Sequence, residues 1–186
     1  MSRIKVIHEH EAEGRLKEIY DHLLKKRGKV AEVHKIQSLH PESVMKHMDL
    51  YMEIMFSKSP LSRAEREMIA VVVSAANGCE YCQEHHGQAL LHYWKDEQKV
   101  KQLQTDYRKL NLSEREEALC TFAVELTEEP DRFEDYDGTP DLRNRGLDDR
   151  AILDATLVIS YFNFVNRIVL SMGVPLEEDK GAGYKY

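Results

Sequence analysis

The amino-acid sequence predicts an all-α fold, a single-domain helical bundle of about six to eight helices that spans residues 1–186. Apolar residues recur three, four and seven positions apart over long stretches, which is the spacing of one face of an α-helix. Five prolines and nine glycines are too few for the many turns of an all-β fold. No alternation of strands and helices typical of a parallel sheet appears, and the chain is long enough for one hydrophobic core.

The first half of the sequence predicts two helices before its most apolar segment. One helix begins near Leu16 and ends at Gly28, a residue suited to the left-handed conformation after a helix. The second runs from Pro41 to Phe56. Each has one apolar face that we expect to be buried: Leu16, Ile19, Tyr20, Leu23 and Leu24 in the first, and Val44, Met48, Tyr51, Met52 and Met55 in the second.

The centre of the domain is expected in residues 61–95. Ser62-Arg63-Ala64-Glu65 is a capping box, which starts a helix by satisfying free backbone N–H groups. That helix is apolar almost all round between Met68 and Ala76, as is typical of a buried central helix. Asn77-Gly78 ends it, and another helix is predicted from about Cys79 to Lys95.

The second half predicts three further helices. A short one covers residues 97–107, and Ser113-Glu114-Arg115-Glu116 is a second capping box that starts the next. Residues 130–145 are rich in Asp, Gly and Pro and are expected to form a loop. Asp148 precedes a long helix over residues 149–172, which Gly173 ends, and residues 177–186 are expected to be a flexible tail.

The composition indicates a soluble globular protein that does not bind nucleic acid. The net charge is −7, and basic residues are interleaved with acidic ones rather than gathered in a patch. No apolar run approaches the roughly 20 residues of a membrane span, and the N-terminus lacks the apolar stretch of a signal peptide. We therefore expect a cytoplasmic protein without a membrane partner, and we predict no cofactor.

The segment Cys79-Glu80-Tyr81-Cys82, followed by His86, is the candidate site of chemistry. A cysteine pair in a reducing compartment is more often catalytic or metal-binding than structural. Residues three apart share a helix face, so the two sulfurs can form a disulfide. The positive end of the helix dipole favours a thiolate at Cys79. His86, one turn after Cys82, is placed to remove a proton from Cys82, which favours that residue as the nucleophile.

Glu67 is the candidate partner of His86. It lies twelve residues before Cys79, on a helix face made of small and apolar residues. A carboxylate there is expected to be buried with a partner or to line a pocket. By accepting a hydrogen bond from His86, it would hold the imidazole in one tautomer.

Other interpretations of the same residues stay open. The thiols could be inert and buried, or they could form a zinc site with His86 and either His85 or Cys120. Against zinc, no second cysteine pair completes the ligand set. Cys120 is expected in the core, and seven further histidines are expected near solvent: His8, His10, His22, His34, His40, His47 and His85.

The spacing of Glu67, Cys79, Cys82 and His86 resembles the motif of the alkylhydroperoxidase D-like family, in the peroxidase-related branch of the carboxymuconolactone decarboxylase-like superfamily. The resemblance is strongest over residues 61–90. It implies reduction of hydrogen peroxide or organic hydroperoxides, an external dithiol reductant, and a homo-oligomer such as a dimer, trimer or hexamer. It also implies that Cys82 attacks the peroxide, Cys79 resolves the sulfenic acid, His86 is the base and Glu67 orients it.

One position departs from the family pattern. Tyr81 stands where alkylhydroperoxidase D has a histidine, and a phenol is a poor base at neutral pH. A disulfide reductase or a redox-sensing module of the same superfamily is therefore kept as an alternative. A lactone decarboxylase of the superfamily is a further alternative, although the decarboxylases generally do not depend on a cysteine pair.

Overall fold

The helices of the protein follow the segments that the apolar spacing predicts. A computed structural model describes residues 2–179, and within them it contains nine α-helices and no strand, so the all-α prediction is confirmed. The α-helices are α1 (Gly14–Arg27), α2 (Glu32–Lys35), α3 (Pro41–Phe56), α4 (Arg63–Ala76), α5 (Glu80–Trp94), α6 (Glu97–Thr105), α7 (Glu114–Glu128), α8 (Thr139–Asn144) and α9 (Asp149–Met172). Two 3₁₀ helices join them, η1 (Tyr107–Lys109) and η2 (Pro130–Glu134).

The structure corrects the predicted loop over residues 130–145, because η2 and α8 lie within it. The side chain of Asp137 accepts a hydrogen bond from the backbone N–H of Thr139, and Pro140 occupies the first turn of α8, where its missing N–H costs nothing. Leu142 is buried and anchors this short helix. The polar composition of this segment concealed its one buried apolar residue. Helices α8 and the four-residue α2 (Glu32–Lys35) are the two beyond the seven that the sequence located, so the described residues hold one more α-helix than the predicted six to eight.

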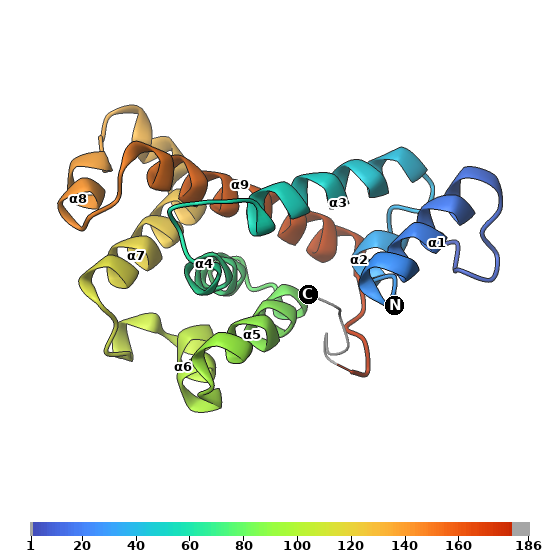
Figure 1. The fold of residues 1–186 in the computed structure, drawn as a ribbon, viewed down its shortest axis with the longest axis horizontal. Coiled ribbons are helices and arrows are strands. Elements are labelled where there is room, and N and C mark those ends of the chain that lie inside the picture. Colours follow the sequence, from blue (N-terminus) through green and yellow to red (C-terminus); the bar gives the residue numbers. More distant parts are fainter. Residues whose placement is uncertain (1, 180–186) are drawn as a thin grey trace.

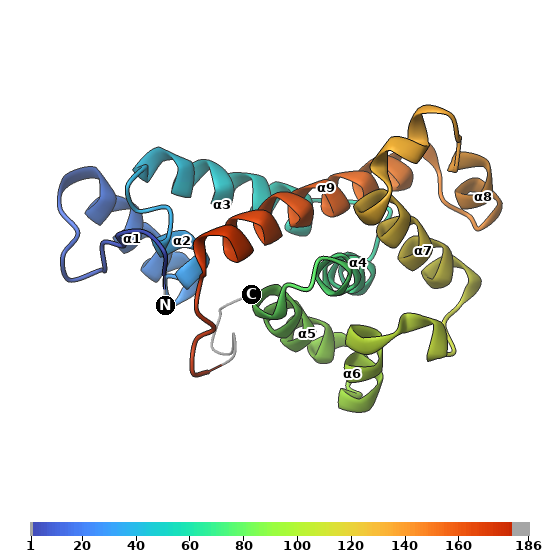
Figure 2. The same ribbon diagram turned by 180° about the vertical axis from the view of Figure 1, so that it is seen from behind.

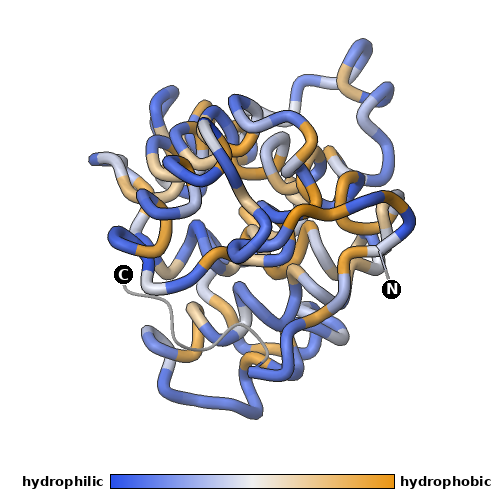
Figure 3. Tube along the Cα trace, turned by 90° about the vertical axis from the view of Figure 1, so that its right-hand side faces the viewer, coloured by the Kyte–Doolittle hydropathy of each residue, from blue (hydrophilic) through white to orange (hydrophobic). Residues whose placement is uncertain are grey.

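Helix α4 lies at the centre of the fold. Figures 1 and 2 show it nearly end-on, with α9 and α3 on one side and α5 on the other. Nine of its 14 residues are buried, which explains its apolar composition on every face. The other helices are amphipathic, and in Figure 3 orange apolar positions alternate with blue polar ones along them. Leu24 and Met52, which were expected on buried faces, are instead exposed.

Both predicted capping boxes are present at the starts of α4 and α7. In each, a serine hydroxyl accepts a hydrogen bond from the backbone N–H three residues later, and a glutamate carboxylate accepts one from the serine N–H. The two motifs also meet, because Arg115 Nε lies 2.6 Å from Glu65 Oε1. The caps therefore fix both helix starts and their relative position.

The turn between α4 and α5 places the cysteine pair. Gly78 adopts a φ of +65°, a left-handed conformation that favours glycine. The chain then reverses, and the Cys79 N–H donates to the Ser74 carbonyl over 2.8 Å. As a result, Cys79 is the residue that caps the N-terminus of α5.

Helix α9 is the longest helix, and 11 of its 24 residues are buried. By length and composition alone it could cross a membrane. The sequence did not suggest this, because polar residues interrupt its apolar runs. Core helices of soluble proteins pass the same test. Its buried residues pack on α3, α4 and α7, so it forms part of the core.

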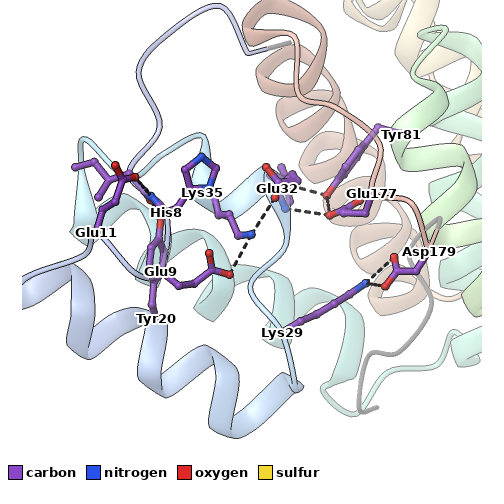
Figure 4. A network of polar contacts seen from close by, with 12 residues as sticks. His8, Glu9, Glu11, Tyr20, Lys29, Glu32, Lys35, Tyr81, Glu177 and Asp179 are labelled. Carbon is purple, nitrogen blue, oxygen red and sulfur yellow. Dashed lines mark hydrogen bonds and ion pairs between the residues drawn. The ribbon is translucent and has the colours of Figure 1, made fainter.

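The segment after α9 is bound to the rest of the protein as far as the structure describes it. Residues 177–179 are therefore not the flexible tail that was predicted there. Glu177 Oε1 accepts hydrogen bonds from the Tyr81 hydroxyl (2.9 Å) and the Glu32 N–H (3.0 Å), and Oε2 lies 2.7 Å from His85 Nε2. Asp179 forms an ion pair with Lys29 over 2.7 Å (Figure 4). We call Glu177 and Asp179 with these partners the C-terminal clasp. The rest of the predicted tail, residues 180–186, lies outside the described residues.

Replacing Leu119 with alanine tests the assigned core. Leu119 is fully buried in α7, so Leu119→Ala should lower the free energy of unfolding by about 2–5 kcal/mol, through lost burial and the cavity left behind. Leu39→Ala is the matched control, because Leu39 is 56% exposed and the same change there should cost about 0.5 kcal/mol or less. Urea unfolding measures both; equal losses would contradict the core assignment.

Replacing Glu177 with glutamine tests the clasp through its pH dependence. Burial alone would raise the pKa of Glu177, but the hydrogen bond and charge of His85 and the backbone N–H groups lower it from 4.5 to about 2. A lowered pKa stabilises the fold above pH 4.5, and this stabilisation is lost as the pH falls from 4.5 towards 2. Allowing for partial exposure, we expect wild type to exceed Glu177→Gln by about 1–2 kcal/mol at pH 7.

The free energy of unfolding of both proteins between pH 7 and pH 3 is the measurement. The difference between them should shrink on acidification, since the wild-type carboxylate then takes up a proton. A difference that stays constant over this range would show that the Glu177 charge does not hold the clasp.

Candidate active site

The cysteine pair occupies the first turn of α5, buried beneath the protein surface. Cys79 is the N-cap and Cys82 is the third helical residue, so the Cys82 N–H points towards Cys79. Both are free thiols, with exposed fractions of 0% and 2%. The two side chains contact each other directly, as the three-residue spacing predicts.

Cys79 is the more acidic of the two thiols. The side-chain hydrogen bond from the Cys82 thiol lowers the pKa of Cys79, and the Cys82 backbone N–H lowers it further against the effect of burial. The same side-chain bond raises the pKa of Cys82 well above its usual value, and burial adds to this. The helix N-terminus therefore favours a thiolate at Cys79, as the dipole predicts, and Cys82 needs a base before it can react.

Asn166 of α9 supports the Cys82 side of the pair. It is fully buried, and its side chain hydrogen-bonds to Cys82, which lowers the pKa of that thiol and so opposes the larger effect of Cys79. Its Oδ1 accepts a hydrogen bond from Asn77 Nδ2 over 3.1 Å, and its Nδ2 donates to Ser74 Oγ over 3.3 Å. These contacts fix the amide between α4 and α5, next to the sulfur.

Glu67 and His86 meet across the helix pair α4 and α5. Glu67 is fully buried, and its Oε2 lies 2.7 Å from His86 Nδ1. Its other oxygen accepts a hydrogen bond from Arg63 Nη2 over 2.6 Å. Burial would raise the pKa of Glu67, but the charges and hydrogen bonds of His86 and Arg63 outweigh it and hold the pKa below its usual range. The carboxylate is thus ionised, and His86 donates from Nδ1, which leaves Nε2 to act as a base.

A cavity of about 70 Å³ lies beside these groups and gives access to Cys82 but not to Cys79. Its volume exceeds what one water molecule needs several times over. Aromatic rings form much of the wall: the edge of the His86 ring packs on Phe162, with centroids 4.4 Å apart, and Tyr51 and Tyr161 lie 5.9 Å apart. Of the two sulfurs, Cys82 is the one that a small molecule can reach.

Two histidines that were expected at the surface are buried and line this cavity. His34 and His47 have exposed fractions of 9% and 5%, and their rings lie 5.3 Å apart. Burial lowers the pKa of His34 to about 3 and that of His47 to about 4, so both are neutral at physiological pH. The helices α2 and α3 carry them, so the N-terminal part of the chain completes the site.

His85 also differs from its expected place in solvent. Its ring stacks on Tyr81, with centroids 4.2 Å apart, and it is bound by Glu177 of the C-terminal clasp. Tyr81, which replaces the family's histidine, donates to the same carboxylate. Tyr81 therefore lines the cavity and binds the segment after α9 through its hydroxyl.

The zinc alternative finds no support in the arrangement of the side chains. Among residues 2–179, no three His, Cys, Asp or Glu side chains are placed to hold a metal ion together. Cys120 is fully buried in the apolar core, as predicted, and burial raises the pKa of its thiol.

The sequence missed several residues of the site, for different reasons. Arg63 is four residues before Glu67, and this helical spacing could have identified it as the ion-pair partner. Asn166 belongs to the long C-terminal helix, and nothing in the local sequence connects it to Cys82. Tyr161 and Glu177 reach the site from residues distant in the chain, and no sequence pattern predicts their contacts.

The fold is similar to that of several solved structures. Residues 42–125 match the sequence model of the Carboxymuconolactone decarboxylase family. An uncharacterized peroxidase-related protein from Silicibacter sp. TM1040 is 27% identical, with a TM-score of 0.83 over all of both chains. An uncharacterized peroxidase-related protein with an alkylhydroperoxidase AhpD core, from Ralstonia eutropha JMP134, is 24% identical, with a TM-score of 0.85 over 97% of this chain and 94% of the other.

A third similar structure is the debrominase Bmp8, with 18% identity and a TM-score of 0.78 over 97% of this chain and 95% of the other. A comparison with curated proteins found no match. The family match and the shared fold agree with the motif of Glu67, Cys79, Cys82 and His86. Residues 42–125 are therefore similar in sequence to the Carboxymuconolactone decarboxylase family, and the fold of the whole chain is similar to that of the peroxidase-related proteins.

Proposed function

We propose that the protein is a thiol-dependent peroxidase that reduces hydrogen peroxide or organic hydroperoxides and is recycled by an external dithiol. One observation carries this proposal: Cys82 lines a small cavity next to His86, whose Nδ1 is bound to the buried carboxylate of Glu67. A reachable thiol, an oriented base and an adjacent second thiol are the parts that two-electron peroxide reduction requires.

The proposed reaction begins at Cys82. His86 Nε2 takes the thiol proton, directly or through a water molecule, and Glu67 stabilises the imidazolium that forms. The thiolate attacks the terminal oxygen of the hydroperoxide, an S–O bond forms, and the O–O bond breaks with its electron pair leaving on the second oxygen. The proton held by His86 passes to that oxygen, so the products are the Cys82 sulfenic acid and an alcohol or water.

Cys79 completes the cycle in this proposal. Its lowered pKa favours the thiolate, which attacks the Cys82 sulfur; an S–S bond forms and the sulfenic oxygen leaves as water after taking up a proton. The external dithiol then reduces the disulfide and is itself oxidised. Burial of Cys79 away from the cavity suits this second role, because peroxide cannot reach it first.

The cellular setting and the assembly are also part of the proposal. Three free thiols are consistent with a reducing compartment such as the cytoplasm. Exposed apolar side chains along α9, such as Leu153, Leu157 and Phe164, support self-association into a homo-oligomer.

A second candidate function is reductive debromination of an aromatic ring. The aromatic walls of the cavity favour it, because flat rings pack well against Tyr51, Tyr161 and Phe162. A debrominase is among the similar structures, and a cysteine-to-alanine variant of it holds 2,3,4-tribromopyrrole. Release of bromide from a brominated pyrrole, without consumption of peroxide, would favour this candidate. Oxidation that stops after one turnover would instead favour a redox sensor.

Serine substitutions of the cysteines test the two roles. Cys82→Ser should abolish consumption of cumene hydroperoxide in the presence of dithiothreitol, because the reachable thiol is lost. Without dithiothreitol, Cys79→Ser should consume about one equivalent and keep a sulfenic acid on Cys82, whereas wild type should form the Cys79–Cys82 disulfide. Cys120→Ala removes a buried thiol outside the cavity and is the control that should keep turnover. Full turnover by Cys82→Ser would refute its assigned role.

Replacing Glu67 with glutamine tests the oriented base. Glu67→Gln keeps the size of the side chain but removes the charge that supports the His86 imidazolium, so kcat/KM should fall about 100-fold or more. Glu84→Gln makes the same change on α5 outside the cavity and should leave kcat/KM within about twofold. Steady-state peroxide consumption compares the two variants. Equal activities would show that His86 does not act through Glu67.

A further inference from the structure

Besides the pair of Glu67 and His86, a chain of hydrogen bonds through α3 and α9 reaches the cavity. The chemistry of its groups determines which of them donate and which accept. It begins at Gln37, whose Nε2 lies 2.8 Å from the Val33 carbonyl and 2.7 Å from His47 Nδ1. It continues from His47 Nε2 to the Tyr161 hydroxyl over 2.7 Å. The proposed reaction above uses none of these residues.

The Val33 carbonyl fixes the orientation of the Gln37 amide. A carbonyl oxygen only accepts hydrogen bonds, so the amide nitrogen of Gln37, and not its oxygen, must face it. The same nitrogen points its second hydrogen at His47 Nδ1. Since an amide NH₂ cannot accept a hydrogen bond, Nδ1 carries no proton.

The tautomer of His47 follows from this. A neutral imidazole carries one proton, which here must be on Nε2, and burial lowers the pKa of His47 to about 4, so the ring is neutral. The Nε2–H therefore donates to the oxygen of Tyr161. Because the Tyr161 oxygen accepts this hydrogen bond, the phenolic hydrogen of Tyr161 points away from His47.

The phenolic hydrogen of Tyr161 has the cavity available to it. The Tyr161 side chain is buried and lines the cavity together with Cys82 and His86. Within the described residues, His47 is the single hydrogen-bond partner of its hydroxyl. The site thus holds a neutral hydrogen-bond donor, oriented by a fixed tautomer, in the same small space as the reactive sulfur.

We infer that Tyr161 is a further catalytic residue, whose hydroxyl donates a hydrogen bond to the oxygen that leaves when the peroxide O–O bond breaks. This inference rests on the proposed peroxidase function. Negative charge builds up on the leaving oxygen while the sulfur–oxygen bond forms, and a preoriented donor in a dry site stabilises such charge strongly. No proton leaves Tyr161: the alcohol receives the proton that His86 took from Cys82, so atoms and electrons balance as before.

Two classes of peroxide separate this role from a structural one. An alkyl hydroperoxide expels a strongly basic alkoxide, whereas a peracid expels a carboxylate that needs little help. Tyr161→Phe should therefore lower kcat/KM for tert-butyl hydroperoxide about 10- to 100-fold but change kcat/KM for peracetic acid less than about threefold. Tyr107→Phe is the matched control, since its buried hydroxyl bonds to Thr121 away from the cavity, and it should change neither value.

The outcomes are distinguishable. Equal losses for both peroxides, or no loss, would overturn the inference while leaving the peroxidase function intact. A wild-type protein that consumes neither peroxide would overturn both. ¹⁵N NMR of the wild-type protein tests the orientation without relying on any variant: His47 should carry its proton on Nε2, and a proton on Nδ1 would overturn the inference.

Discussion

The site depends on one buried charge, the carboxylate of Glu67. An isolated carboxylate in the core would be expensive, and here Arg63 and His86 each bind one of its oxygens, at 2.6 and 2.7 Å. The arrangement ties the start of α4 to the middle of α5 and leaves one imidazole nitrogen of His86 free to act as a base. The capping boxes and the turn at Gly78 hold these two helices in the required register.

The reactive side chains and most of the cavity walls come from different parts of the chain. Helices α4 and α5 carry Glu67, the cysteine pair and His86, whereas α2, α3 and α9 supply His34, His47 and Tyr161 as walls. The C-terminal clasp then binds α2 and α5 together through Glu177. This division allows the wall residues to change without disturbing the helix pair that carries the cysteines. The likeness to both peroxidase-related proteins and a debrominase is consistent with such a division.

Local patterns predicted seven of the nine α-helices in the described residues, because each of the seven shows helical apolar spacing or a capping signal. The contact between Glu67 and His86 was expected because a carboxylate on an apolar helix face needs a partner. The buried positions of His34 and His47 could not be predicted, since a histidine at a helix start or among methionines looks like a surface residue until its partner is known. His47 meets Tyr161 across 114 residues, and His85 meets Glu177 across 92. Such contacts depend on how helices pack, which apolar spacing alone does not determine.

In the proposed mechanism His86, held by Glu67, activates Cys82 and not Cys79. Trapping of the sulfenic acid with a dimedone probe, after addition of one equivalent of hydroperoxide, tests it most directly. In Cys79→Ser protein the label should appear on Cys82 within a single turnover, and adding Glu67→Gln should slow labelling at least tenfold. Label on Cys79 in Cys82→Ser protein at the same rate, or labelling of Cys82 that is indifferent to Glu67, would contradict the account.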